Sequence, residues 1–258
     1  ELSQKLASAR AEKKKPYNGR GIALASRDIT EGEANIEEGL KENGRASILT
    51  TVSDTGTGAH TIFRQIVSEA WKIYPQKVDV DLGTTDTFPT DVRVIASLVT
   101  YLGGHALRQA AFALRDQVIK AAAANFQCLP DAIEVASGTV VGPGKQKMRL
   151  SELAALASSS NKPLTARGNI KVKDRANAVC FFAQGAEVKV DPETGQVKVL
   201  KITSAHDVGT VINPLTHRGQ VEGGMVQGFG FALMENRQDE DRKILTNNLG
   251  EYKRPNIQ

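Results

Sequence analysis

A strand, a glycine-containing turn and an amphipathic helix follow one another between residues 45 and 71, and this stretch constrains the fold most strongly. Residues 45–52, RASILTTV, are typical of a strand, and DTGTG follows at 54–58. The apolar side chains after this turn recur at helical spacing, at Ala59, Ile62, Phe63, Ile66, Val67, Ala70 and Trp71. The stretch therefore predicts a helix that lies on a sheet.

Two hairpins are also indicated by the sequence. Residues 33–40 and 45–52 flank KENG, which predicts a hairpin with Asn43 and Gly44 in its turn. Residues 186–202, AEVKVDPETGQVKVLKI, predict a second hairpin around DPETG. Strand and helix patterns thus alternate along the chain.

Two further helices complete this outline. One is expected from Ser97 to about Ala124, and the glycine-rich residues 219–233 predict another, which is apolar nearly all round and therefore buried. Together these elements predict an α+β chain of two packed α/β lobes, with mixed sheets covered by helices. We expect a polar lead-in at 1–18, a first lobe at 19–127 and a second lobe at 128–258.

Composition excludes several classes of protein. The 33 basic and 29 acidic residues leave a net charge of +4, too small and too scattered to indicate a nucleic-acid partner. No apolar run approaches the roughly 18 residues of a membrane span. Cys128 and Cys180 are far apart, so this chain alone builds neither a disulfide framework nor an iron–sulfur cluster. Two buried, reduced thiols and a cytoplasmic location are expected.

The triplet Asp54-Thr55-Gly56 is also the signature of aspartic proteases. Those enzymes need two carboxylates that share a proton, about 3 Å apart. The candidate for a second motif is HDVGT at 206–210, where Val208 replaces the hydroxyl residue, and the first motif feeds directly into a helix. An aspartic protease therefore remains only a remote alternative.

The same turn has the character of a ligand-binding helix N-terminus. Backbone N–H groups point outward at such an end, with the positive end of the helix dipole behind them. Gly56 and Gly58 let a ligand approach the backbone without a Cβ in the way. A tight strand-to-helix connection explains the glycines as well, so the turn alone leaves both interpretations open.

Three distant segments together resemble the molybdopterin-binding region of the xanthine dehydrogenase and aldehyde oxidase family, in the C-terminal portion of its large subunit. The first is DTGTG with its helix, the second is SLVTYLGGHAL at 97–107, and the third is DVGTVINPLTHRGQVEGGMVQGFG at 207–230. In the third segment, GQVEGG with VQG close behind is the most specific match. The hairpin just before DVG also matches the family in place and character.

This resemblance implies a site for molybdopterin, in its simple or its cytosine dinucleotide form, that is shared with parts of the enzyme outside this chain. Gly56, Thr57 and Gly58 would lie along the cofactor, Ser97 would donate a hydrogen bond to the pterin, and Gln220 would hydrogen-bond the pterin ring. The dithiolene sulfurs of the cofactor hold the molybdenum, so no metal ligand from the protein is expected. The four histidines are interpreted as surface or hydrogen-bonded side chains.

The activity that the resemblance implies is oxidative hydroxylation of an aldehyde or N-heterocycle, with water as the oxygen source. The implied partners are the remaining molybdopterin-binding portion, iron–sulfur and flavin domains or subunits, and a small-molecule substrate. No catalytic residue is assigned. Gly250-Glu251 resembles the family's catalytic pair, but YKRP at 252–255 matches a segment that lies well upstream of that pair. The chain alone is therefore expected to be inactive.

A second hypothesis is that the chain has the fold of this family but no longer binds the cofactor. Thr57 stands where the family commonly has glutamine, and Val99 stands where a second serine or a glycine-rich run is common. A hydroxyl reaches less far than an amide and donates only one proton. These departures favour, as the alternative, a non-catalytic scaffold that has lost the cofactor.

Overall fold

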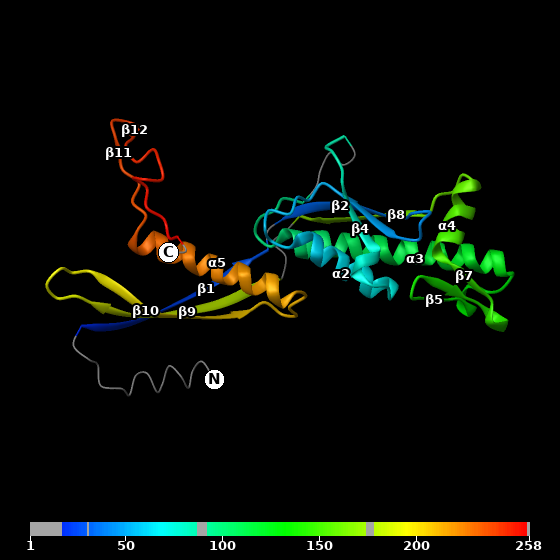
Figure 1. Ribbon diagram of the computed structural model, residues 1–258, viewed down its shortest axis with the longest axis horizontal. Coiled ribbons are helices and arrows are strands. Elements are labelled where there is room, and N and C mark those ends of the chain that lie inside the picture. The colour runs from blue at the N-terminus through cyan, green and yellow to red at the C-terminus, as the bar shows by residue number, and fades with distance from the viewer. Residues whose placement is uncertain (1–16, 30, 87–91, 174–177, 257–258) are drawn as a thin grey trace. The chain divides into compact units, whose positions relative to one another are not determined.

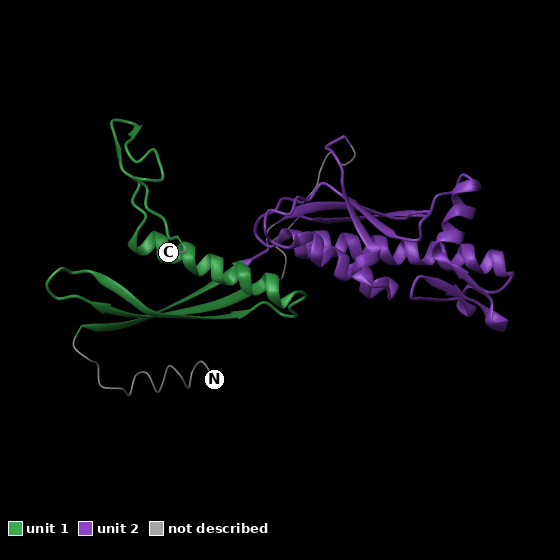
Figure 2. Cartoon of the chain, viewed as in Figure 1, with its two compact units in different colours: residues 1–27, 179–258 green, residues 28–178 purple. Residues whose placement is uncertain are grey.

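The structure of the chain is a computed structural model that describes residues 17–29, 31–86, 92–173 and 178–256. The chain divides into two compact units (Figure 2). Residues 28–178 form the larger unit, and residues 1–27 with 179–258 form the smaller one. Most of the polar lead-in expected at 1–18 lies outside the described residues.

A four-stranded mixed sheet, in the order β4-β3-β2-β8, is the centre of the larger unit (Figure 1). Strand β2 is antiparallel to both of its neighbours, whereas β3 and β4 are parallel and are joined by helix α2. Two parallel strands with a crossover helix form a βαβ unit, in which the chain leaves both strands at the same edge of the sheet. The elements are β2 (Gly32–Leu40), β3 (Ala46–Thr50), α2 (Ala59–Trp71), β4 (Val78–Leu82) and β8 (Thr165–Val172).

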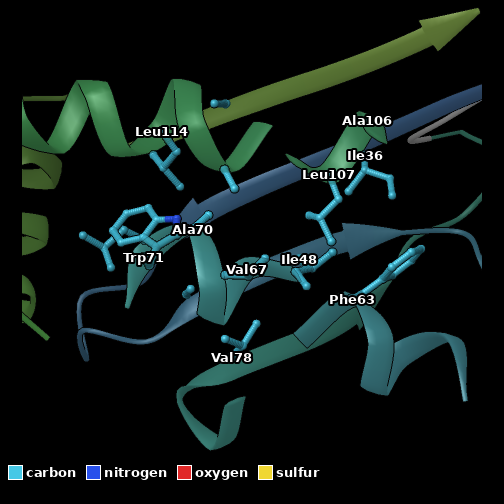
Figure 3. Packing of buried hydrophobic residues seen from close by; sticks show 14 of the residues in the cluster. Ile36, Ile48, Phe63, Val67, Ala70, Trp71, Val78, Ala106, Leu107 and Leu114 are labelled. Carbon is cyan, nitrogen blue, oxygen red and sulfur yellow. The ribbon is translucent and has the colours of Figure 1, made fainter. Parts of the chain in front are cut away.

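Helices α2 and α3 (Gly104–Phe126) cover one face of this sheet. Along β2 the side chains alternate, with Ile36 fully buried toward the helices and Glu37 only half-buried on the other face. Helix α2 turns Phe63 and Trp71 into the same layer, where both are fully buried (Figure 3). The hydrophobic core of the chain lies within residues 29–166, between the sheet and the helices and in the small sheet beyond them.

The predicted hairpin at 33–52 and the predicted helix from Ala59 are confirmed. In the hairpin, Gly44 has φ 78° and the Asn43 side chain accepts a hydrogen bond of 3.0 Å from the Arg45 N–H. The register then pairs Leu40 with Ala46. The residues that predicted the turn, Asn43 and Gly44, therefore form the turn that connects these two strands.

A small antiparallel sheet and a short helix complete the larger unit. The sheet has the order β5-β6-β7, and Phe126, at the end of α3, packs against Gly142, which follows β6. Three single-turn 3₁₀ helices, η1, η3 and η4, each begin with a proline. The elements are η1 (Pro75–Lys77), η3 (Pro130–Ala132), β5 (Glu134–Ala136), β6 (Thr139–Val141), η4 (Pro143–Lys145), β7 (Lys147–Arg149) and α4 (Leu150–Ser159).

The two units divide the chain elsewhere than at the expected boundary, 127/128. Strand β8 pairs with β2 along its length, and the Glu37–Arg167 ion pair joins residues 130 positions apart. This pairing keeps β8, as far as Val172, in the larger unit. Strand β1 (Asn18–Asp28) instead pairs with β9 (Val179–Val190) of the smaller unit.

We predict that Gly168→Ala strongly destabilises the larger unit. A Cβ at Gly168 of β8 would overlap the backbone carbonyl oxygen of Ala106 in α3, and backbone cannot move aside as a flexible side chain can. Overpacking of this kind costs about 1–3 kcal/mol or more, which urea unfolding would measure. Gly39→Ala on β2 is the matched control, because its Cβ would meet side-chain atoms no closer than 3.3 Å. Equal stability of the two variants would contradict the close approach of α3 and β8.

The smaller unit contains a three-stranded sheet, in the order β1-β9-β10, and helix α5. The predicted DPETG hairpin is confirmed: Asp191 accepts a hydrogen bond of 2.9 Å from the Glu193 N–H, and Gly195 has φ 72°. Asn213 caps α5 by accepting hydrogen bonds from the N–H groups of Leu215 and Thr216. The elements are β9 (Val179–Val190), β10 (Val197–Asp207), α5 (Pro214–Leu233), β11 (Asp239–Glu240) and β12 (Lys243–Ile244).

The expected mixture of sheets and helices is confirmed, but the expected burial of the glycine-rich helix is wrong within this chain. Gly230 is the one buried residue of α5, and Leu215 is 81% exposed. The helix is apolar in composition, as predicted. In the described part of the chain, however, other residues of the protein pack against only one side of α5.

Candidate functional site

The segments that follow β3 and β4 leave the sheet at the same edge. Strands β3 and β4 are parallel neighbours. Their ends are joined by a hydrogen bond of 2.8 Å, which the N–H of Gly83 donates to the carbonyl oxygen of Thr50. In α/β sheets, ligands bind beyond the carboxyl ends of parallel strands. This edge is the place in the larger unit where a site is expected.

The DTGTG turn after β3 is held by its own aspartate. One carboxylate oxygen of Asp54 accepts backbone hydrogen bonds from Gly56, at 3.1 Å, and Gly58, at 3.0 Å. Desolvation is the largest single influence on the pKa of Asp54, and it raises that pKa. Hydrogen bonds from the N–H groups of Gly58, Gly56 and His60, together with the charge of His60, lower it by more. The pKa of Asp54 therefore lies below its ordinary value. Asp54 is thus a fixed anion that shapes the turn.

The turn presents glycines in conformations that other residues rarely adopt. Gly56 has φ 95°, and no atom lies within 4 Å of the place where its Cβ would be. Gly58 has φ 76° and is the N-cap of α2, with no side chain that caps the helix. The backbone at Gly56 is therefore open to close approach by a ligand.

Thr57, between these glycines, carries an unpaired hydroxyl. Its Oγ1 is buried and has no hydrogen-bond partner among the described residues. Buried polar atoms in native proteins are nearly always paired, with protein, water or a ligand. An open glycine beside an orphaned hydroxyl fits a polar ligand at this turn.

His60 and His105 are each hydrogen-bonded to a backbone carbonyl group, in agreement with their interpretation as surface or hydrogen-bonded side chains. The Nε2 of His60 lies 2.7 Å from the carbonyl oxygen of Val52, which ties the end of β3 to the first turn of α2. The Nδ1 of His105 lies 2.6 Å from the carbonyl oxygen of Tyr101.

Ser97 lies in the segment after β4 and directly precedes a helical segment that runs without a break from Leu98 to Phe126, so the predicted start of the long helix is correct to within one residue. Ala96 (φ 53°) and Ser97 (φ 61°), just before it, both adopt the left-handed conformation. The chain then enters a π-helical turn, η2 (Val99–Gly103), before α3. Residues held in such sparsely populated conformations store strain and cluster at functional sites.

Helix α2 packs against the junction of η2 and α3. A Cβ on Gly103 would lie 3.1 Å from the ring of Phe63, and a Cβ on Gly104 would lie 3.2 Å from Ile66. Gly58 precedes Phe63 by five residues, and Ser97 precedes Gly103 by six. Four of the five expected residues, namely Gly56, Thr57, Gly58 and Ser97, thus belong to the larger unit, in the segments that lead into α2 and η2. The fifth, Gln220, is exposed on α5 and belongs to the smaller unit.

A polar group in the smaller unit was missed by the sequence analysis. The Ser204 hydroxyl lies 2.7 Å from Nε2 of His206, the Phe182 ring stacks on His206 at 5.6 Å, and the His217 ring meets His206 edge-on at 6.5 Å. Burial, and secondarily the charge of His217, lowers the pKa of His206. His206 lies on β10 and His217 on α5, eleven positions later, and their rings meet where the helix turns back onto the strand. The sequence pattern of either element alone does not predict this contact.

No group of three or more His, Cys, Asp or Glu side chains in the described ranges could hold a metal ion. Among the helices that the structure describes, none is long and apolar enough to cross a membrane.

The whole chain, residues 1–258, matches a family model described as a molybdopterin cofactor-binding domain. The gamma subunit of the 6-hydroxypseudooxynicotine dehydrogenase complex of Paenarthrobacter nicotinovorans is 32% identical over 260 residues, which cover 96% of this chain and 32% of that protein. The putative xanthine dehydrogenase molybdenum-binding subunit of Escherichia coli (strain K12) is 30% identical over 227 residues, which cover 84% of this chain and 30% of that protein.

Solved structures agree on the fold. Quinoline 2-oxidoreductase from Pseudomonas putida 86 is similar with a TM-score of 0.78 at 23% identity, over 99% of this chain and 35% of that one. Reconstituted CO dehydrogenase from Oligotropha carboxidovorans gives 0.79 at 21% identity, over 99% and 34%. The chain spans about a third of the length of the curated relatives above. From its whole-length match, the chain belongs to the molybdopterin cofactor-binding domain family.

Proposed function

We propose that this chain contributes one part of the molybdopterin site of a molybdenum hydroxylase, which oxidises an aldehyde or an N-heterocycle with oxygen from water. The whole-length match to a molybdopterin cofactor-binding domain carries this proposal. The open glycine and the orphaned Thr57 hydroxyl support it, because both fit a polar ligand at the turn. Family membership leaves the aspartic protease alternative without support.

The residues of this chain would hold the cofactor rather than perform its chemistry. Backbone groups at Gly56 and Gly58 and the Thr57 hydroxyl would bind along the cofactor, and Ser97 and Gln220 would hydrogen-bond the pterin. Asp54 keeps the turn in shape through its two backbone hydrogen bonds. When bound, the molybdenum cofactor, in its simple or cytosine dinucleotide form, supplies the redox centre.

We assign no catalytic base to this chain. Glu251 is exposed in a turn, where its own N–H donates to the side chain of Asn248. General-base help contributes about 10²–10⁴-fold to a proton-transfer step, so the rest of the enzyme must supply that group. The proposed partners are the remaining molybdopterin-binding portion and iron–sulfur and flavin domains or subunits. The free thiols of Cys128 and Cys180 suit the cytoplasmic location we propose.

Oxidation of aldehydes and purines with an artificial dye acceptor tests this proposal. We expect no turnover by the chain alone with added molybdenum cofactor, and turnover after assembly with its partner subunits. Turnover by the chain alone that disappears in Glu251→Gln would show that the base lies here. An assembled complex that contains no molybdenum would favour the non-catalytic scaffold, which Thr57 and Val99 suggested.

A further inference from the structure

The ring of His206 is the point at which helix α5 meets the sheet of its own unit. His206 lies on β10 opposite Phe182 of β9, and the two rings stack at 5.6 Å with 15° between their planes. The ring of His217, in the first turn of α5, meets His206 edge-on at 6.5 Å. Among the described residues, this is the one ring contact between the helix and the sheet.

Few other side chains hold the first half of α5 in place. Three more residues recur at the same spacing as His217 and are only half-buried, at Val221, Met225 and Phe229. Gly230 is the one buried residue of the helix, and a Cβ built on it would meet Glu235 and Pro255 rather than the sheet. Segments with few buried apolar side chains open at a low cost in free energy. The contact between His206 and His217 therefore has a large share in seating this half of the helix.

In the described part of the chain, no carboxylate compensates a positive charge on either ring. Asp207 follows His206, but successive side chains of a strand point to opposite faces, and Asp207 accepts a hydrogen bond of 3.4 Å from the Gly209 N–H. Arg218 and Glu222, beside His217, form an ion pair of 2.6 Å with each other. The other charged residues of the surrounding strands are Arg20, Arg27 and Asp28 on β1, Glu187 and Lys189 on β9, and Lys198 and Lys201 on β10. None of these described groups forms an ion pair with His206 or His217.

The contact favours the neutral form of His206. The Ser204 hydroxyl, 2.7 Å from Nε2, serves the neutral and the charged ring alike, because a hydroxyl both donates and accepts. Burial disfavours the charged ring, and the charge of His217 adds to this effect, so the pKa of His206 lies below its ordinary value of 6.5. At neutral pH the ring is therefore uncharged and packs between Phe182 and His217.

Acid weakens the seating of α5 on the sheet. Above pH 6.5 His206 is uncharged whether the helix is seated or released, so the full stability of the contact is present. As pH falls below 6.5 the released state takes up a proton first, and the seated state loses stability until pH passes the lower pKa of the packed ring. Mild acid thus shifts the equilibrium toward release.

We propose that the contact between His206 and His217 is a pH-sensitive switch, which holds the first half of α5 on its sheet at neutral pH and releases it in mild acid. Gln220 follows His217 by three residues on the same helix, so release moves the amide that we propose for the pterin. This consequence rests on the proposed function. The switch itself depends only on contacts within the smaller unit.

Hydrogen exchange of the backbone amides, in the full chain without cofactor, tests this switch. Protection factors, which are corrected for the intrinsic pH dependence of exchange, are compared at about pH 7.5 and 5.5. We expect the protection of residues 217–226 to fall severalfold in acid, by up to about tenfold for each unit by which the two pKa values of His206 differ. Helix α3 of the larger unit keeps its protection. His105→Phe, which removes an exposed histidine of α3, is the matched control and shows the same fall in α5.

Two phenylalanine variants identify the group that titrates. His206→Phe keeps an aromatic ring against Phe182 and takes up no proton, so α5 should be as well protected in acid as at neutral pH. His217→Phe removes the second charge and should reduce the fall. Equal protection of the wild-type helix at both pH values would overturn the proposal. A fall of wild-type size in both variants would also overturn it, because another group would then carry the pH dependence. No cofactor is present, so these results do not depend on the proposed function.

Discussion

Glu38→Gln is expected to stabilise the larger unit at neutral and alkaline pH and to remove most of the pH dependence of its unfolding. Glu38 faces the helices from β2, is fully buried, and both of its carboxyl oxygens lack a hydrogen-bond partner among the described residues. Burial raises its pKa to about 8, and the nearby Trp71 indole offsets only part of this effect. The carboxyl group is therefore protonated in the folded chain at neutral pH.

The direction of the pH effect follows from these values. Below the ordinary pKa of 4.5 both the folded and the unfolded chain are protonated at Glu38, so the full stability is present. As pH rises from there to about 8, the unfolded chain releases a proton that the folded chain keeps. Stability then falls by about 1.4 kcal/mol per pH unit, which amounts to a loss on the order of 5 kcal/mol above the folded pKa.

Urea unfolding at pH 5, 7 and 9 measures this effect, followed by the fluorescence of Trp71, the chain's single tryptophan. Trp71 is fully buried in the larger unit and reports on it directly. Glu37→Gln is the control, because Glu37 lies on the outer face of β2 and pairs with Arg167. If wild type and Glu38→Gln lose stability equally between pH 5 and 9, Glu38 is not a buried neutral acid.

Thr57→Val and Gln220→Leu are each expected to lower the molybdenum and pterin content of the assembled enzyme about tenfold. Leaving polar groups of a bound ligand unpaired costs roughly 1–3 kcal/mol, and 1.4 kcal/mol corresponds to a tenfold change in affinity. In the chain alone, Thr57→Val should be neutral or slightly stabilising, because it removes a buried hydroxyl that has no partner among the described residues.

Thr57→Ser, which keeps the hydroxyl, is the matched control and should retain most of the cofactor. Metal analysis and pterin fluorescence of purified complexes give both contents. Full occupancy in Thr57→Val and in Gln220→Leu together would mean that these residues serve packing alone.

The first hairpin and helix α2 could be predicted from the sequence, because residues close together in the chain determine them. Asn43 and Gly44 specify the turn of the first hairpin, and the helical spacing of Phe63, Val67 and Trp71 specifies α2 and its buried face. Both depend on residues within a few positions of one another. The same holds for the glycines of the DTGTG turn.

Long-range contacts could not be read in this way. The pairing of β2 with β8 joins residues about 130 positions apart, and it moved the boundary of the larger unit away from residue 127. The left-handed conformations of Ala96 and Ser97 and the π-helical turn that follows them were not predicted, because neither alanine nor serine favours a positive φ and π-helical turns are rare. Helix α5 was expected to be buried from its composition, but composition does not say which polypeptide supplies the cover.

The most direct test of the central claim is a structure of the assembled holoenzyme with the pterin located. The account predicts backbone groups of Gly56 to Gly58 and the Thr57 hydroxyl along the cofactor, with Ser97 and the side-chain amide of Gln220 within hydrogen-bond distance of the pterin. A pterin held wholly by the other portion of the subunit, with the DTGTG turn facing only protein, would contradict it.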